Sequence, residues 1–217
     1  MKSHRNWMAA ACLAAATLAG SLPAHADEEG PRFPAAKAEE LSADQKDAAG
    51  EVLKQSSAGL GGPYGMLIKT PELLRRYLMM TEYLRQKSSL PKRLSEMTIL
   101  LEARLWDADY EWWAHYPLAQ KAGVPEAMIT DIKEGRRPAN MKEDEALVYD
   151  VVTETLRDRK LTDKTFQRAT QVLGEQQVID VVAIAGFYMM VSAVVIAGRV
   201  QPPPGQNPHQ LPVLIKK

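Results

Sequence analysis

The chain has 217 residues, of which 46% are hydrophobic and 25% are charged, a composition that suits one globular domain with tails. Its 27 basic and 27 acidic residues cancel to a formal net charge of zero. This balance excludes the strongly basic character that is typical of nucleic-acid-binding proteins, so we expect no nucleic-acid partner.

The first 26 residues have the pattern of a secretory signal peptide. Lys2 and Arg5 give a basic start, residues 7–22 form an apolar run, and Ala24-His25-Ala26 is a cleavage signal. The alternative is a membrane anchor, but the run is short for a span of ~20 residues. We therefore predict cleavage after Ala26 and a periplasmic or secreted protein.

Removal of this segment would also remove Cys12, the only cysteine in the chain. The mature protein would then have no disulfide, no catalytic thiolate and no metal site built on cysteine. A core large enough to be stable without cross-links is expected.

The following residues predict a short lead-in and then helices. Residues 27–40 are charged and contain proline, which predicts a flexible lead-in. Residues 41–200 are expected to form the helical domain. Ser42 and Gln45 are spaced as a capping box, and Val52 and Leu53 give the first helix an apolar face. The glycine-rich stretch 59–63 ends that helix.

Thr70-Pro71-Glu72 predicts the start of a second helix, with a capping hydroxyl and a proline at the first helical position. The apolar stripe expected to be buried on this helix consists of Leu73, Leu74, Tyr77, Leu78 and Leu84.

Pro91 begins the next helix, and Glu96 lies within its apolar positions. A helix over 109–122 follows and carries the sequence YEWWAH at 110–115. Pro117 lies inside this helix, where a proline is expected to kink or break it.

Further helices are predicted from Glu126 to about Gly135, over 142–158, over 162–173 and over 181–198. The last has 18 residues without a charge, long enough to be considered as a membrane span. Its many small residues and lack of flanking basic clusters favour a helix buried on all sides in a bundle or a subunit interface. The proline-rich residues 201–217 predict an extended tail. No segment alternates like a strand, so the expected fold class is all-α.

Several motifs in this order resemble the carboxymuconolactone decarboxylase-like family, which includes the alkylhydroperoxidase-D (AhpD) type. The resemblance covers residues 41 to about 204. It is carried by Thr70-Pro71-Glu72-Leu73, by 89-SLPKRLSE-96, by Tyr110-Glu111-Trp112 with His115, by 119-AQKAGV-124 and by Gly186-Phe187-Tyr188. The resemblance implies an all-helical AhpD-like bundle that assembles as a homotrimer or homohexamer.

The redox branch of that family has two cysteines, which fall on Ala108 and Glu111 in this chain. Thiol peroxidase activity is therefore not expected. The branch without cysteines decarboxylates a lactone carboxylate in aromatic-acid breakdown. The resemblance then implies a small-molecule substrate and no cofactor.

Candidate catalytic residues are His115, Glu111 and Glu96. Glu111 and His115 lie four residues apart and so share one face of a helix. His115 suits a general acid, and a buried Glu96 would be expected to carry a proton. Tyr110, Trp112 and Trp113 are candidate walls for a flat substrate. Arg104, or Arg93, is a candidate to bind its carboxylate.

Each of these residues also has a structural interpretation. His115 can be a core histidine bonded to a glutamate, and Glu96 can pair with an arginine to hold two helices together. The tryptophan pair can be core packing, and Arg104 a paired surface residue. A metal site on Glu and His is not expected, because no HExxH-like spacing is present.

The sequence thus favours an exported, cofactor-free lyase or isomerase acting on a small cyclic carboxylate or lactone. The first alternative is a non-catalytic helical oligomer that binds or supports other molecules. The second is an antioxidant protein, which the missing cysteines disfavour. We expect no stable membrane span in the mature protein.

Overall fold

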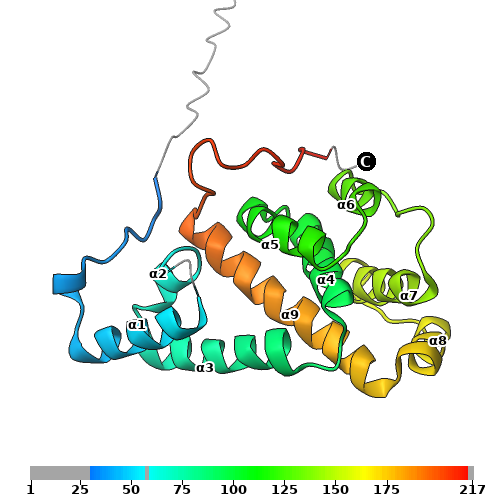
Figure 1. The fold of residues 1–217 in the computed structure, drawn as a ribbon, viewed down its shortest axis with the longest axis horizontal. Helices are drawn as coiled ribbons and strands as arrows, with labels where there is room; N and C mark the ends of the chain where they lie inside the picture. The colour runs from blue at the N-terminus through cyan, green and yellow to red at the C-terminus, as the bar shows by residue number, and fades with distance from the viewer. Residues whose placement is uncertain (1–29, 57–58, 215–217) are drawn as a thin grey trace, which may run out of the picture.

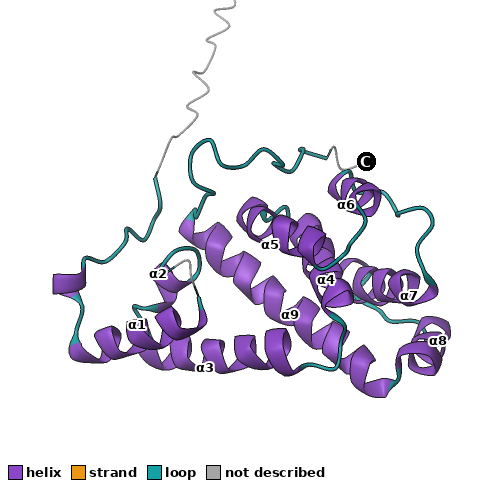
Figure 2. Ribbon diagram, in the orientation of Figure 1, coloured by secondary structure: helices purple, strands orange, loops and turns teal. Residues whose placement is uncertain are grey.

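The computed structural model describes residues 30–56 and 59–214, and every regular element in these ranges is helical (Figures 1 and 2). The predicted signal peptide at 1–26 lies outside the described residues. The helices are α1 (Ala43–Gln55), α2 (Tyr64–Leu67), α3 (Pro71–Glu82), α4 (Lys92–Leu105), α5 (Asp109–Lys121), α6 (Glu126–Lys133), α7 (Glu143–Val152), α8 (Asp163–Leu173) and α9 (Glu175–Gly198). A 3-10 turn, η1 (Ala38–Glu40), precedes α1, and π-helical turns extend α3 (η2, Tyr83–Lys87) and α7 (η3, Thr153–Arg157).

Helix α4 is the centre of the fold. It packs against α5, α6, α7 and α9, while α1, α2 and α3 lie at one end and α8 at the other (Figure 1). All eleven residues from Leu94 to Arg104 are buried. A helix surrounded in this way has no face on which to expose polar side chains, so its acidic and basic residues must find partners inside the protein.

Local sequence signals set most of the helix starts. Ser42 and Gln45 form the predicted capping box at α1, and α3 begins at Pro71 as expected. Thr70 makes no side-chain cap bond, however, and α5 continues through Pro117 without a break. Helix α2 was not predicted.

Two leucines expected in buried stripes are exposed. Leu53 on α1 is 65% exposed, whereas its neighbour Val52 is buried. Leu73 on α3 is also exposed, and Leu74 takes the inward position. In each pair the side chains point to different sides of the helix, and only one side meets the core.

Helix α9 begins at Glu175, earlier than predicted, and the single chain does not bury it on all sides, so burial in a subunit interface stays a prediction. One face packs on α4, α5, α7 and α8. The opposite face exposes Ile179, Val182, Met190 and Ile196, and less than half of the most apolar window is buried. By length and composition, α9 is the one described helix that could cross a membrane, although core helices of soluble proteins have the same properties.

Both ends of the described chain are fastened to the helices. In the lead-in, the backbone N–H of Arg32 donates to the carbonyl of Gly198 at the end of α9 (2.9 Å). In the C-terminal tail, Asp109 accepts hydrogen bonds from Asn207 and from the N–H of Leu211. The described part of the tail has turns at 204–205 and 208–209 and no helix, and these bonds hold it at the start of α5.

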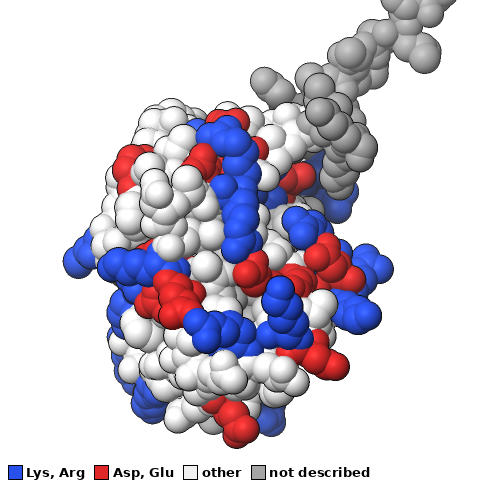
Figure 3. Space-filling model, turned by 90° about the vertical axis from the view of Figure 1, so that its right-hand side faces the viewer, with Lys and Arg blue, Asp and Glu red and all other residues white. Residues whose placement is uncertain are grey.

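Charges of both signs alternate over the side of the molecule where α6, α7 and α8 lie (Figure 3). Ion pairs account for part of this pattern: Arg137 pairs with Asp150, and Arg168 pairs with Glu143. Exposed pairs of this kind contribute little to stability, so the fold rests mainly on the apolar core around α4.

Truncating the core of α4 should cost far more than truncating an exposed leucine. Leu100 is completely buried, so we expect Leu100→Ala to lower the free energy of unfolding by about 2–5 kcal/mol. The matched control Leu53→Ala should change it by no more than about 0.5 kcal/mol. Urea denaturation followed by circular dichroism measures both values. Equal losses in the two variants would contradict the central position of α4.

Candidate functional site

The site is a cluster of three buried side chains, Glu96 on α4 and Glu111 and His115 on α5, here called the Glu–His cluster. The helical repeat places Glu111 and His115 on one face of α5, and the packing of α5 on α4 brings that face to Glu96. Nδ1 of His115 lies 2.7 Å from Oε2 of Glu96, a hydrogen bond. Nε2 lies 3.8 Å from Oε2 of Glu111. The three predicted catalytic residues are therefore brought together.

Sequence reasoning did not identify Arg85, which joins the cluster from η2. Its Nη2 lies 3.5 Å from Oε1 of Glu96, so Glu96 contacts His115 with one oxygen and Arg85 with the other. Arg85 follows the buried Leu84 directly, at the end of an apolar stripe. A positively charged residue directly after a buried leucine is the signal that could have pointed to Arg85. No motif or spacing in the sequence, however, links Arg85 to Glu96.

The two carboxyl groups of the cluster have pKa values shifted in opposite directions. Burial alone raises the pKa of Glu96, but the hydrogen bond and charge of His115, together with the charge of Arg85, outweigh it and hold that pKa below its ordinary value. Burial raises the pKa of Glu111, and His115 and Arg85 oppose this only in part. Glu96 is thus the more readily ionised of the two carboxyl groups, and Glu111 holds its proton to a higher pH than an exposed glutamate.

A small inner cavity of about 140 Å³ reaches Glu111 and His115. It shares six lining residues with an outer groove of about 880 Å³, so the two spaces are adjacent. The shared residues are Ser56, Tyr64, Thr81, Arg85, Tyr110 and Ala114. The cluster therefore lies at the inner end of a pocket whose wider part could hold the body of a ligand.

Tyrosines form much of the wall of the inner cavity. Tyr188 on α9 meets the His115 ring edge-on, with ring centroids 4.9 Å apart. Tyr64 and Tyr77 also line the cavity and contact each other edge-on. Burial raises the pKa of Tyr110 to about 12, so its hydroxyl stays protonated and can donate a hydrogen bond.

A glycine allows the loop before α2 to approach this wall closely. Gly62 has a φ of +60°, and a Cβ atom there would lie 2.6 Å from the hydroxyl oxygen of Tyr110. A side chain at this position would both strain the backbone and displace the tyrosine. The glycine-rich stretch therefore has a role beyond ending the first helix.

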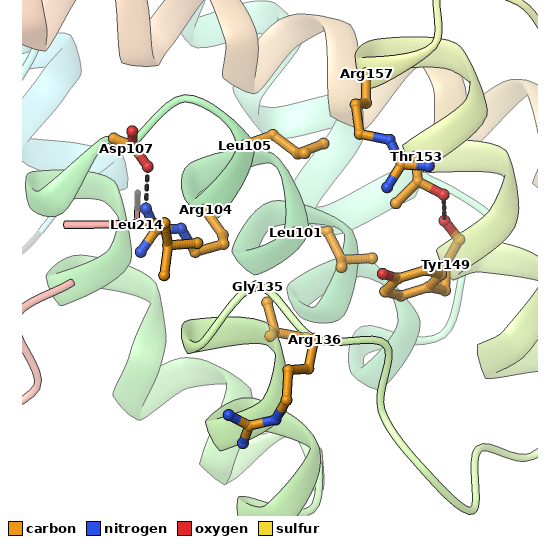
Figure 4. Close-up of a pocket in the computed structure, with 11 residues that line it drawn as sticks. Leu101, Arg104, Leu105, Asp107, Gly135, Arg136, Tyr149, Thr153, Arg157 and Leu214 are labelled. Atoms are coloured by element: carbon orange, nitrogen blue, oxygen red, sulfur yellow. Dashed lines mark hydrogen bonds and ion pairs between the residues drawn. The ribbon is translucent and has the colours of Figure 1, made fainter. Parts of the chain in front are cut away.

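The other predicted binding residues are distributed differently. Tyr110 lines both the inner cavity and the outer groove, and Trp113 lines the outer groove. Trp112 is fully buried in the core and lines neither space. Arg104 is not brought to the cluster either. It lies in a separate space, here called the arginine cavity, where it pairs with Asp107 (Figure 4).

Another buried carboxyl contact, also missed by sequence reasoning, joins α4 to α9. The hydroxyl of Ser192 donates to Oε2 of Glu102 (3.0 Å), and Oε1 of Glu102 has no partner among the described residues. Burial raises the pKa of Glu102 to about 8; the hydrogen bond from Ser192 opposes this shift and the charge of Glu111 adds to it. Glu102 is therefore a protonated acid in the core near neutral pH.

Within the described ranges, no group of three or more histidine, aspartate or glutamate side chains is arranged to hold a metal ion. The chemistry available to the cluster from its own residues is proton transfer between carboxyl groups and an imidazole, next to a fixed guanidinium charge.

Comparison with known proteins supports the fold. No protein-family profile matches the chain, and no curated protein matches it in sequence. It is similar in structure to the AhpD core of a peroxidase-related protein from Ralstonia eutropha JMP134 (TM-score 0.68, 14% identity, 81% of this chain and 94% of that one). A peroxidase-related protein from Silicibacter sp. TM1040 is similar too (TM-score 0.66, 14% identity, 83% and 94%).

A third similar structure is a protein of unknown function from Agrobacterium tumefaciens, provisionally assigned to AhpD-type antioxidant defence (TM-score 0.57, 16% identity, 64% of this chain and 95% of that one). At these identities the comparisons establish the fold alone. The predicted all-helical, AhpD-like fold is confirmed. The decarboxylase branch stays a prediction, since none of these three names refers to it.

Removing the charge from Glu102 should change how stability depends on pH. The folded state holds this proton more tightly than the unfolded chain, whose carboxyl has a pKa near 4.5. The contribution of Glu102 is therefore fully present below about pH 4.5 and is lost as the pH rises toward 8. Relative to Glu102→Gln, the wild type should lose up to about 1.4 kcal/mol of unfolding free energy per pH unit across this window.

Urea denaturation at several pH values measures this difference. Ser192→Ala is the matched control, because it removes the hydrogen bond and keeps the titrating group, so its stability should still fall with pH relative to Glu102→Gln. Wild type and Glu102→Gln with parallel stabilities from pH 4.5 to 8 would contradict a protonated Glu102.

Proposed function

We propose that this protein is an exported, cofactor-free lyase or isomerase of the carboxymuconolactone decarboxylase type, acting on a small cyclic carboxylate or lactone. The observation that carries the proposal is His115 placed between two buried carboxyl groups whose pKa values are shifted in opposite directions. Acid–base catalysis requires one group that is ionised and another that carries a proton, and these opposite shifts suit Glu96 to the first role and Glu111 to the second.

The contacts of His115 favour a division of roles between its two ring nitrogens. An ionised Glu96 accepts a hydrogen bond, so Nδ1 carries the proton that it donates. The distance from Nε2 to Glu111 exceeds a hydrogen bond, which leaves both atoms available to a third group in the inner cavity. A substrate atom there could exchange a proton with either of them.

Arg85 is the residue we assign to the substrate carboxylate, in place of Arg104. It lines both the inner cavity and the outer groove, and it keeps its charge at all relevant pH values. Its only ion pair in the described structure is the 3.5 Å contact with Glu96, so N–H donors remain for a ligand.

In the proposed decarboxylation, the bond between the carboxylate carbon and the ring breaks and carbon dioxide leaves. The electron pair moves onto the neighbouring unsaturated carbonyl and forms an enolate, whose oxygen the hydroxyl of Tyr110 or Tyr64 can stabilise. Glu111 then delivers its proton to the carbon, and the enolate returns to the carbonyl. The carboxylate of Glu111 regains a proton from solvent through Nε2 of His115, which completes the cycle. Isomerisation would use the same groups without loss of carbon dioxide.

Two alternatives are distinguished from this proposal by simple assays. A non-catalytic helical protein would retain the Glu96–His115 bond only to hold α4 on α5, and would turn over no substrate. An antioxidant role is suggested by the names of the similar structures. With Ala108 and Glu111 at the cysteine positions, we expect no peroxide consumption with dithiol donors.

Replacing His115 should abolish most of the activity. We expect His115→Gln to lower turnover on a panel of lactone acids by about 100- to 10,000-fold, because it removes general acid–base function. Release of carbon dioxide and loss of substrate are measured, with folding checked by circular dichroism. The matched control is His209→Gln, a histidine outside the inner cavity that stacks on Tyr116, and it should keep full turnover. Unchanged turnover in His115→Gln would exclude the proposed role.

Assembly and export are further parts of the proposal. The exposed apolar side chains of α9 are large for a free surface, which supports a homo-oligomer, a trimer or hexamer in the family it resembles. Native mass spectrometry of the full-length gene product, taken from a periplasmic extract without detergent, should show three or six copies of a chain lacking residues 1–26. A monomer would contradict the proposed oligomer, and an uncleaved chain would contradict removal of the signal peptide. A protein released only by detergent would contradict export without a membrane span.

A further inference from the structure

The arginine cavity is a second space of about 610 Å³, on the side of α4 that faces α6 and α7 (Figure 4). Its walls come from the end of α4, from α6, α7 and η3, and from the C-terminal tail. None of its lining residues lines the inner cavity or the outer groove. The volume is within the range of about 300–1,000 Å³ that is usual for small-molecule sites.

The floor of the arginine cavity is apolar. Leu101 and Leu105 contribute from α4, Ile132 from α6 and Leu214 from the tail. Leu214 is packed closely against Gly135, where a Cβ atom would lie 2.5 Å from its Cδ1, and Gly135 has a φ of +68°. The tail is therefore a built part of this wall, and the floor can accept a hydrocarbon group.

Two side chains that line the same cavity, Arg157 and Tyr149, have hydrogen-bond donors without a partner among the described residues. Arg157 on η3 binds Asp158 through Nε and Nη2, which leaves Nη1 without a hydrogen bond to any described residue. The hydroxyl of Tyr149 on α7 makes no hydrogen bond to any described residue, although the side chain is almost fully buried. Figure 4 shows the Arg157 guanidinium and the Tyr149 hydroxyl both directed toward Leu101.

These two groups act on each other electrostatically. Burial raises the pKa of Tyr149, and the positive charge of Arg157 acts against that shift. The phenol stays protonated at neutral pH, so a hydroxyl donor and a guanidinium donor line the same cavity. The lining has three arginines, Arg104, Arg136 and Arg157, and each also pairs with an acid: Asp107, Asp131 and Asp158, respectively. The capacity to bind an anion therefore comes from the Nη1 donor of Arg157 and the hydroxyl of Tyr149 rather than from an excess of positive charge.

We propose that the arginine cavity binds a small organic acid with an apolar body, independently of the Glu–His cluster. Its carboxylate bonds to Nη1 of Arg157 and to the hydroxyl of Tyr149, and its hydrocarbon part lies against Leu101, Leu105 and Leu214. Arg104 has a different role: it is almost fully buried, and its Nη1 holds the carbonyls of Lys133 and Pro212, which fixes the tail over the site.

Isothermal titration calorimetry with octanoate on the full chain tests the proposal. Octanoate should bind the wild type, whereas 1-octanol, which lacks the charge, and acetate, which lacks the hydrocarbon, should each bind at least about tenfold more weakly. Arg157→Gln should weaken octanoate binding by about 10- to 100-fold, the effect of one charged hydrogen bond.

Tyr149→Phe should weaken binding by about two- to tenfold, the effect of one neutral hydrogen bond, and it keeps the ring on which Arg137 stacks. It also serves as the second variant if Arg157→Gln fails to fold. The matched control is Arg168→Gln, an exposed arginine on α8 paired with Glu143, which should leave affinity unchanged.

Three outcomes would overturn the proposal. The wild type could fail to bind octanoate, both Arg157→Gln and Tyr149→Phe could bind octanoate as tightly as the wild type does, or the wild type could bind 1-octanol as tightly as octanoate. A loss of binding in His115→Gln but not in Arg157→Gln would place the ligand at the Glu–His cluster instead, and would also overturn it.

Discussion

The burial of α4 on every side is the constraint on which the rest of the structure depends. Polar side chains in the middle of this helix cannot reach water, so its buried carboxyl groups take partners from other elements. Glu96 takes His115 from α5 and Arg85 from η2, while Glu102 takes Ser192 from α9. The contacts that make the site are therefore the same contacts that hold the central helix to its neighbours. A substitution that removes one of these contacts therefore changes both the site and the packing of α4.

Burial also explains why similar side chains behave differently. Glu96, Glu102 and Glu111 are all buried glutamates, yet only Glu96 has both a histidine and an arginine within 4 Å. Its pKa is lowered, whereas the pKa values of Glu102 and Glu111 are raised because the cost of a charge in the core is not offset. The buried core of α4 and α5 thus holds one acid with a lowered pKa and two with raised pKa values. Carboxyl groups with pKa values shifted in opposite directions suit proton transfer.

The same helix separates two cavities of different character. The side that carries Glu96 faces tyrosines and a narrow inner cavity, whereas the side that carries Leu101 faces an apolar floor with arginines around it. The C-terminal tail forms a wall of the second cavity only. The outer face of α9 is a third feature, apolar and uncovered in the single chain. Each of these surfaces points to a different kind of partner: a reacting substrate, a bound organic acid and a second subunit.

The sequence by itself determined the helical class, most helix starts and the pairing of Glu111 with His115. These features are local: caps and prolines act within one turn, and residues four apart share a helix face whatever surrounds the helix. Only the tertiary structure decided that Arg85 joins Glu96, that Arg104 lies in another cavity, that Trp112 belongs to the core and that α9 exposes an apolar face. Those outcomes depend on how the helices cross, and the pKa shifts depend on burial. Both are properties of the whole packed chain, which no spacing of residues along the sequence specifies.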